Sequence, residues 1–152
     1  MKITWFGRSC FRVETGSSVV LIDPYLKGNP TFEGSETEWD AATKGVTHAA
    51  LTHGHDDHVG NAPEICQVCG ATLFAVFELA KHLADKGAEN LEPMNTGGTV
   101  KSDDFDLTMV HARHSSSSSG VYLGNPCGII LRAKEGKTLY HMDDTRFSGT
   151  WP

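Results

Sequence analysis

The sequence lacks long hydrophobic runs and contains few cysteines. Its 152 residues are 39% hydrophobic and 21% charged, with a formal net charge of −6, values that are ordinary for one globular domain. No apolar run approaches the roughly 20 residues of a membrane-spanning helix, and Met1-Lys2-Ile3 leads into a strand pattern in place of a signal peptide. We therefore expect a single domain over residues 1–152, cytoplasmic and without membrane contact.

The four cysteines are scattered along the chain, and Cys66 and Cys69 form its one Cys-x-x-Cys pair. A single pair of this kind is weak evidence for a zinc or redox site. The pair lies on a predicted helix among apolar neighbours, so we expect buried free thiols.

Motifs for phosphate or nucleic-acid binding are also lacking. Gly97-Gly98 is too short for a phosphate-binding loop, and no basic patch with interleaved aromatic residues occurs. The negative net charge argues further against binding to long nucleic acids. No spacing indicates a Ser-His-Asp or cysteine nucleophile, so a protein nucleophile is not expected.

The most informative segment is Thr52–Gly60, in which His53, His55, Asp57 and His58 follow the pattern His-x-His-x-Asp-His. Side chains of these types, when crowded together, must be solvated, hydrogen-bonded or bound to a metal. Imidazole favours zinc and its neighbours, and carboxylate also accepts manganese or iron. A polar surface loop that happens to be rich in histidine is the alternative interpretation.

The spacing of this motif predicts two metal positions. Residues 46–51 have the composition of a buried strand, so His53 and His55 lie just past its end. Side chains at positions i and i+2 project to one side of an extended chain, and their nitrogens can meet at one ion. Asp57 and His58 are adjacent and cannot both join that face, so each would reach a neighbouring position as the chain turns.

The rest of the chain alternates strand and helix patterns. The helix after the motif is expected to begin at Asn61 as N-cap, with Pro63 in its first turn and Glu64 at the capping-box position, and to stop at Gly70. Residues 24–40 are predicted to form a loop at the metal cleft, and the serine run 115–119 a site loop. A second helix is predicted over residues 78–86, and strands over residues 3–6, 11–14, 19–22, 72–75, 105–110, 121–123, 128–132 and 138–141.

The motif resembles the signature of the metallo-β-lactamase superfamily of hydrolases. Other segments resemble a "metal-dependent hydrolase" family within it, the relatives of ascorbate-6-phosphate lactonase, and they occur in the expected order: residues 1–11, 20–24, 77–80, 93–98, 114–117, 124–128 and 140–145. The resemblance covers essentially the whole chain. It implies an α+β fold, a metallo-β-lactamase-type αββα sandwich of which this chain would hold the N-terminal two-thirds.

The resemblance also implies a set of metal ligands. His53, His55 and His114 would hold a first divalent ion, and a second would be held by Asp57, His58 and Asp144, with Asp144 bridging the two ions. Zinc is the expected metal, with manganese or iron as alternatives. Asp57 would in addition orient the nucleophile or relay its proton.

Further roles follow from the same resemblance. Asp23 would orient the ligand loop, and His141 would lie near Asp144. His111 is the rival of His114 for the third histidine position, and the string His114-Ser115-Ser116-Ser117 favours His114. The two other histidines are expected to be ordinary residues: His48 on a strand and His82 on a helix.

Two features depart from the family pattern. Asp143 stands where the family usually has glycine, so it could strain the loop or add a carboxylate beside the metals. The chain also ends at Thr150-Trp151-Pro152, before the family's final histidine ligand. It could be a fragment, one part of a two-chain assembly, or a half that pairs with itself, and we expect any stable form to be oligomeric.

The function implied is hydrolysis of a small ester, lactone or phosphoester by a hydroxide held between two metal ions. Cations able to hold a phosphate are Arg8, Lys27, Arg113 and Arg146. The alternative is a catalytically incomplete metal-binding or interaction module that needs a partner chain.

Overall fold

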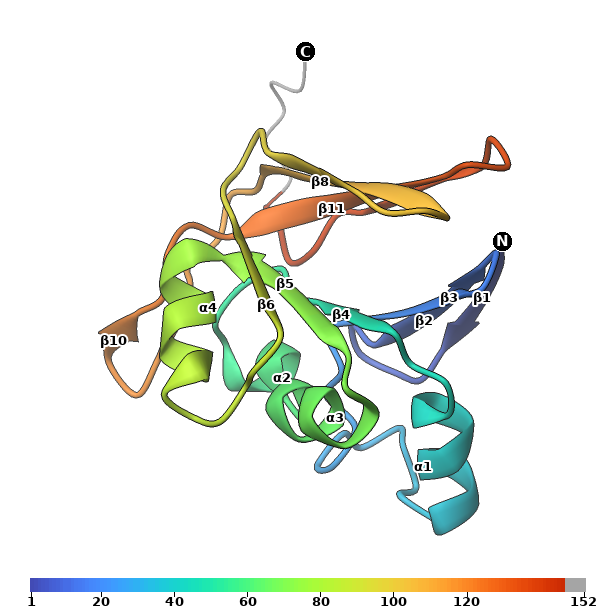
Figure 1. Ribbon diagram of the computed structural model, residues 1–152. Coiled ribbons are helices and arrows are strands. Elements are labelled where there is room, and N and C mark those ends of the chain that lie inside the picture. Colours follow the sequence, from blue (N-terminus) through green and yellow to red (C-terminus); the bar gives the residue numbers. More distant parts are fainter. Residues whose placement is uncertain (147–152) are drawn as a thin grey trace.

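Two β-sheets face each other, and the helices cover the outer side of one of them (Figure 1). This arrangement is seen in a computed structural model that describes residues 1–146; residues 147–152, which include the predicted end of the domain, lie outside the described part. Within residues 1–146, no helix is long and apolar enough to cross a membrane.

The first sheet has six strands in the order β1-β2-β3-β4-β5-β6. The neighbours β1, β2 and β3 are antiparallel, whereas β3 to β6 run parallel and are joined by helical connections. Parallel strands need such crossovers because each must begin at the same edge of the sheet. The strands are Lys2–Trp5, Phe11–Thr15, Ser18–Ile22, His48–Ala50, Thr72–Val76 and Leu91–Met94.

The second sheet has four antiparallel strands in the order β12-β11-β8-β7. Along β8, Phe105, Leu107 and Met109 are buried, and the residues between them are partly exposed. This alternation is typical of a strand with one face on the core. The strands are β7 (Thr99–Lys101), β8 (Phe105–His111), β11 (Cys127–Ala133) and β12 (Thr138–His141), and a small separate hairpin is formed by β9 (Ser117–Ser118) and β10 (Val121–Tyr122).

Asp104 joins the two sheets at one end. Its Oδ2 accepts hydrogen bonds from the backbone N–H of Ser17 (2.9 Å) and from the hydroxyls of Ser17 and Ser18 (2.8 Å each). At the opposite ends of β3 and β4, the chain continues into Asp23 and Thr52. Because β3 and β4 are parallel, these two residues lie at the same sheet edge, and the metal-ligand motif begins there.

The four helices are α1 (Glu36–Thr43), α2 (Asp56–Val59), α3 (Ala62–Cys69) and α4 (Phe77–Ala84). Helix α1 corrects the prediction of a loop over residues 24–40. The side-chain Oγ of Ser35 caps it by accepting from the N–H of Glu38 (3.3 Å), and Ser35-x-x-Glu38 is the N-terminal signal that the sequence analysis overlooked. Strands β6 and β7 were also not predicted, because they are short edge strands of the two sheets.

Helix α3 has its predicted limits, with Pro63 in its first turn and Gly70 in the left-handed conformation at its end. The predicted capping role of Asn61 is wrong, because its side chain makes no cap hydrogen bond. Its Oδ1 instead accepts from the N–H groups of Leu26 (3.2 Å) and Lys27 (2.8 Å). Asn61 therefore ties the loop after Asp23 to the start of α3.

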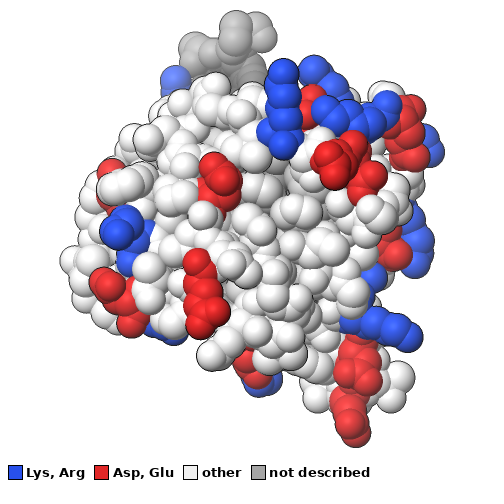
Figure 2. All heavy atoms as spheres, viewed as in Figure 1, with Lys and Arg blue, Asp and Glu red and all other residues white. Residues whose placement is uncertain are grey.

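Charged side chains of both signs occupy the surface around the second sheet. On the face shown in Figure 2, lysine and arginine side chains gather near one end of this sheet, with acidic side chains among them. Lys134 and Asp106 form an ion pair on the second sheet, with Nζ and Oδ1 2.6 Å apart. All four cysteines are free; Cys10, Cys66 and Cys127 are buried, whereas Cys69, the second member of the pair predicted to be buried, is only partly buried.

Candidate metal centre

The predicted ligands come from the ends of three strands. His53 follows β4, His55 stands at the N-cap of α2, and His58 lies on that short helix. His114 follows β8, and Asp144 follows β12. Residues that are 91 positions apart in the sequence, such as Thr52 and Asp143, are thereby in contact.

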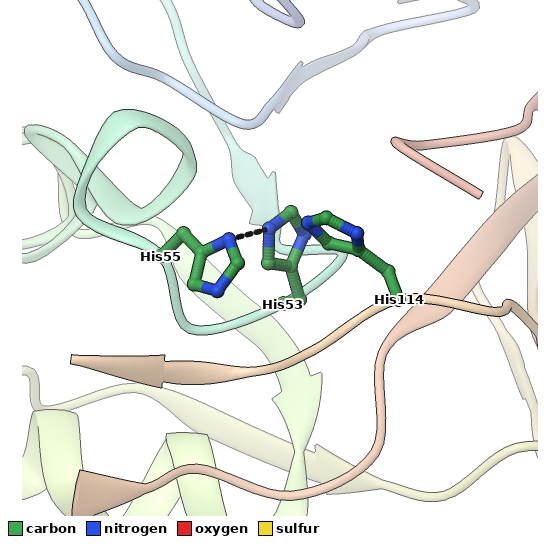
Figure 3. Close-up of side chains that lie close together, drawn as sticks. All are labelled: His53, His55 and His114. Atoms are coloured by element: carbon green, nitrogen blue, oxygen red, sulfur yellow. Dashed lines mark hydrogen bonds between the residues drawn. The ribbon is translucent and has the colours of Figure 1, made fainter. Parts of the chain in front are cut away.

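His53, His55 and His114 form one cluster, and each offers a ring nitrogen within 4.8 Å of the others. Their imidazoles point toward one another from two separate loops (Figure 3). His53 Nε2 and His55 Nδ1 are 2.9 Å apart. The other ring nitrogen of His55 lies 3.1 Å from the hydroxyl of Ser115, so Nδ1 is the atom turned to the centre of the cluster.

A second cluster adjoins the first and shares His53 with it. It consists of His53, His58 and Asp144, again with donor atoms within 4.8 Å. Asp144 Oδ2 lies 3.3 Å from His58 Nε2 and 4.0 Å from His114 Nε2. One carboxylate oxygen therefore lies between the two clusters.

Asp57 is not a member of these clusters, although it lies on the same helix as His58. Its side chain is partly exposed, and its Oδ2 is 3.9 Å from Nη1 of Arg8. Among the described residues, the structure thus brings together five of the six predicted ligands, whereas the sixth, Asp57, belongs to neither cluster.

Buried Asp23 organises the base of the site. Its Oδ1 accepts from the N–H of Thr52 (2.9 Å), and its Oδ2 accepts from the hydroxyl of Thr52 (2.7 Å). The same Oδ2 lies 3.0 Å from His58 Nδ1 and 3.3 Å from His141 Nε2. Asp23 thus contacts the strand end from which the motif starts and one of its histidines, as the resemblance implied.

These contacts have electrostatic consequences. Burial would raise the pKa of Asp23, but hydrogen bonds and charge from His141 and His58 lower it to about 2. Burial would lower the pKa of His58, but the hydrogen bond and charge of Asp23, with the charges of Asp143 and Asp144, raise it to about 9. Burial and the neighbouring imidazoles of His53 and His114 lower the pKa of His55, which favours its neutral, metal-binding form.

Asp143 lies in the same buried layer. Its φ is +61°, and its side chain is fully buried. Its Oδ1 is 2.9 Å from both the Thr52 hydroxyl and His53 Nδ1, and 3.6 Å from His58 Nδ1. Its Oδ2 is buried and has no hydrogen-bond partner among the described residues.

The other histidines lie outside the two clusters. The structure brings His114, and not His111, to His53 and His55, since His111 is exposed at the end of β8. His48 is stacked on Phe74 and packs edge-on against Phe105. His82 lies on α4.

Two serines of the predicted site loop hold the motif in place, a role that the sequence analysis did not assign. The Oγ of buried Ser116 accepts from the N–H of Gly54, between two of the histidines (3.0 Å), and donates to the carbonyl of Leu123 (3.3 Å). Ser118 Oγ donates to Asp56 (2.7 Å). The run of serines next to His114 is the sequence feature from which this role could have been predicted.

The donor set fits divalent metal ions. Imidazole nitrogens suit zinc, and a carboxylate oxygen that lies between two donor clusters suits a pair of cations. Two ring nitrogens only 2.9 Å apart need a proton or a cation between them. The unpartnered buried oxygen of Asp143 adds a negative charge that nearby cations would offset.

Several curated proteins that are similar to this chain are named metal-dependent hydrolases. A metal-dependent hydrolase of Methylocella silvestris is 50% identical over 149 residues, and one of Mesorhizobium japonicum is 49% identical over 152 residues; each alignment covers 95% of this chain and 63% of the relative. The chain thus spans about 63% of the length of these curated relatives.

The fold is shared with a solved structure as well. Igni18, described as a metallo hydrolase from the hyperthermophilic archaeon Ignicoccus hospitalis, superimposes with a TM-score of 0.81 and 32% identity, over 97% of this chain and 62% of that chain. The predicted α+β sandwich is thereby confirmed. The sequence pattern of the metallo-beta-lactamase superfamily matches residues 3–141, and because this match extends over almost all of the chain, the protein belongs to that superfamily.

Proposed function

We propose that this chain is the metal-binding part of a hydrolase that uses two divalent ions on a small ester, lactone or phosphoester. The observation that carries the proposal is the pair of adjoining donor clusters with Asp144 Oδ2 between them. The relatives from Methylocella silvestris and Mesorhizobium japonicum, which are named metal-dependent hydrolases, support it.

In this proposal His53, His55 and His114 hold one ion, and Asp57, His58 and Asp144 hold the other. When bound, two such ions would lower the pKa of water at the site toward about 7 and would polarise the substrate oxygen. Zinc suits the imidazole-rich set best, and manganese or iron are the alternatives.

The side chains around the ligands have separate tasks. Asp57 is partly exposed beside the clusters, so it can accept a proton from a water at the site and release it to solvent. Asp23 Oδ2 contacts His58 Nδ1 and His141 Nε2, and the contact with Nδ1 fixes the orientation of the His58 ring.

Arg8, one of the four cations considered for phosphate binding, lies close to the motif. It lies beside Asp57, with its side chain about half exposed. Lys27 is instead engaged by Glu64 (2.5 Å) and by the ring of Trp39. A substrate with a negative group would therefore be held near Arg8.

An oligomer or a complementing chain remains part of the proposal, and the cytoplasmic location stays a prediction. The alternative function is a metal-binding module without turnover. It is favoured by one observation, namely that the second cluster offers only Asp144 and His58 beside the shared His53.

Metal analysis and substrate screening test the proposal. Protein purified without chelators should contain nearly two ions per chain and hydrolyse members of a panel of p-nitrophenyl esters, lactones and bis-p-nitrophenyl phosphate. His55→Ala should abolish this hydrolysis, whereas His111→Ala, a change of the same type at an exposed histidine outside the clusters, should not. Two bound ions without hydrolysis of any compound would favour the module, and a protein without bound metal would contradict both functions.

A further inference from the structure

Asp143 occupies a costly position. It has a left-handed backbone, its side chain is fully buried, and one of its oxygens has no partner among the described residues. Left-handed backbone costs a non-glycine residue roughly 1 kcal/mol or more, and a buried carboxylate oxygen without a hydrogen bond adds to this cost. Such a residue needs a compensating interaction.

The contact of Asp143 with His53 offsets part of this cost. Nδ1 of His53 lies 2.9 Å from Asp143 Oδ1 and 3.0 Å from the Thr52 hydroxyl oxygen. The single hydroxyl hydrogen of Thr52 points to one of two carboxylates, Asp23 Oδ2 (2.7 Å) or Asp143 Oδ1 (2.9 Å). Both neighbours of Nδ1 are therefore acceptors, and Nδ1 must carry the proton.

This protonation leaves the lone pair of His53 on Nε2. That atom faces His55 Nδ1 at 2.9 Å, inside the first cluster. His58 shows the same arrangement with a different carboxylate, because its Nδ1 lies 3.0 Å from Asp23 while its Nε2 faces Asp144 at 3.3 Å. Each of the two buried histidines of the motif therefore has a carboxylate oxygen close to its Nδ1, from Asp143 for His53 and from Asp23 for His58.

We infer that Asp143 is a positioning residue that holds the proton on Nδ1 of His53, directs Nε2 to the metal and strengthens metal binding. The part that concerns metal rests on the proposed function, whereas the part that concerns the proton does not. Because Asp143 is unfavourable without a cation and favourable beside one, it should affect the metal-free and the metal-loaded protein in opposite directions.

Two substitutions at this position test the inference. Asp143→Gly removes the carboxylate, and because glycine adopts a positive φ without strain, the variant should fold. Asp143→Asn removes the charge but retains an oxygen that can accept from Nδ1. Asp103→Asn is the matched control, because it removes one charge at an exposed position between β7 and β8.

Nitrogen-15 NMR of the imidazole rings in the metal-free protein reports the His53 tautomer. We expect Nδ1–H in the wild type and in Asp143→Asn, and a mixture of tautomers in Asp143→Gly. Competition with a chromophoric chelator should show zinc affinity reduced 10- to 100-fold in Asp143→Gly, less in Asp143→Asn, and unchanged in Asp103→Asn. Urea unfolding should show Asp143→Gly to be more stable than the wild type without metal and less stable with zinc.

The possible results separate this inference from the proposed function. If Asp143→Gly has the zinc affinity and the His53 tautomer of the wild type, the inference is wrong, but the proposed metal centre is not affected. A wild-type protein that binds no zinc would overturn the metal centre and the metal part of the inference together. A wild-type His53 that carries its proton on Nε2 would overturn the remaining part.

Discussion

His111 and His114 lie three residues apart, but only His114 meets the two histidines of the motif. We expect His114→Ala to lower zinc content by about one ion per chain, because three imidazoles would otherwise share that ion. His111→Ala should retain the wild-type zinc content. Elemental analysis of both purified variants measures the difference, and loss of zinc in His111→Ala alone would contradict the assignment.

The pair His58 and Asp23 should make the metal-free protein sensitive to pH. Because the pKa of His58 is raised to about 9, its contribution to stability is fully present below the unfolded value of 6.5 and is lost as the pH rises through 9. We expect the free energy of unfolding to fall by about 1–2 kcal/mol between pH 6.5 and 8. The low pKa of Asp23 arises from His141 as well as from His58, and it adds no pH dependence in this range because Asp23 is ionised in both the folded and the unfolded protein.

Urea unfolding in the presence of a chelator measures this loss. The range ends at pH 8 because buried thiols, whose pKa values are also raised, destabilise the protein at higher pH: Cys10, Cys66 and Cys127. His58→Gln should unfold with a smaller dependence on pH over the same range. A wild-type free energy that does not change from pH 6.5 to 8 would show that the pKa of His58 is not raised.

At the scale of elements, the turn between α2 and α3 must approach the loop after Asp23 closely. Gly60 has a φ of +45°, and a Cβ atom there would lie 2.4 Å from the Cα of Tyr25 and 2.6 Å from the carbonyl oxygen of Pro24. The N–H of Asn61 also donates to that carbonyl (2.9 Å). Glycine at position 60 therefore permits the contact that sets the position of α2 and His58.

Gly60→Ala should destabilise the fold by about 3 kcal/mol or more, because backbone atoms would have to move. Gly45→Ala is the control, since Gly45 also has a positive φ (+71°) but no atom lies within 4 Å of its Cβ position. It should cost only about 1 kcal/mol. Urea unfolding compares the two variants, and equal losses would mean that the contact with Tyr25 is unimportant.

Some elements could be predicted from the sequence and others could not, for physical reasons. The longer strands and the apolar stripe of α4 were predicted because burial imposes a period on the sequence. The edge strand β6 contains Pro93 and the edge strand β7 has three residues, so neither shows a clear pattern. The predicted capping role of Asn61 was wrong because its side chain accepts from two backbone N–H groups of a nearby loop. That loop is about 35 residues away in the sequence, so a local capping rule could not predict the contact.

At the scale of the whole molecule, apolar side chains are exposed along the edge strand β1. Ile3 and Trp5 lie on one face of this strand and are about half exposed. An exposed, apolar edge strand favours association with another chain. We therefore expect light scattering to give a mass above that of one 16.5 kDa chain.

Trp5→Lys should lower the measured mass by placing a charge on this edge. Val68→Thr is the control, because Val68 is exposed on α3, away from β1. A wild-type protein that is folded and monomeric at all concentrations would contradict the expected oligomer. A lower mass in Val68→Thr would assign the association to a different surface.

The sequence by itself determined the chemistry of the site, because three imidazoles and a carboxylate within six positions have few uses other than binding metal. It also determined the strands before the motif and the helix after it. The family resemblance had implied His114 and Asp144, but only the tertiary structure brings them to the motif, from the ends of β8 and β12, and places Asp143 against His53. Periodicity and capping act over a few residues, whereas the distance between His53 and Asp143 depends on how the two sheets face each other, and this depends on the packing of the whole core.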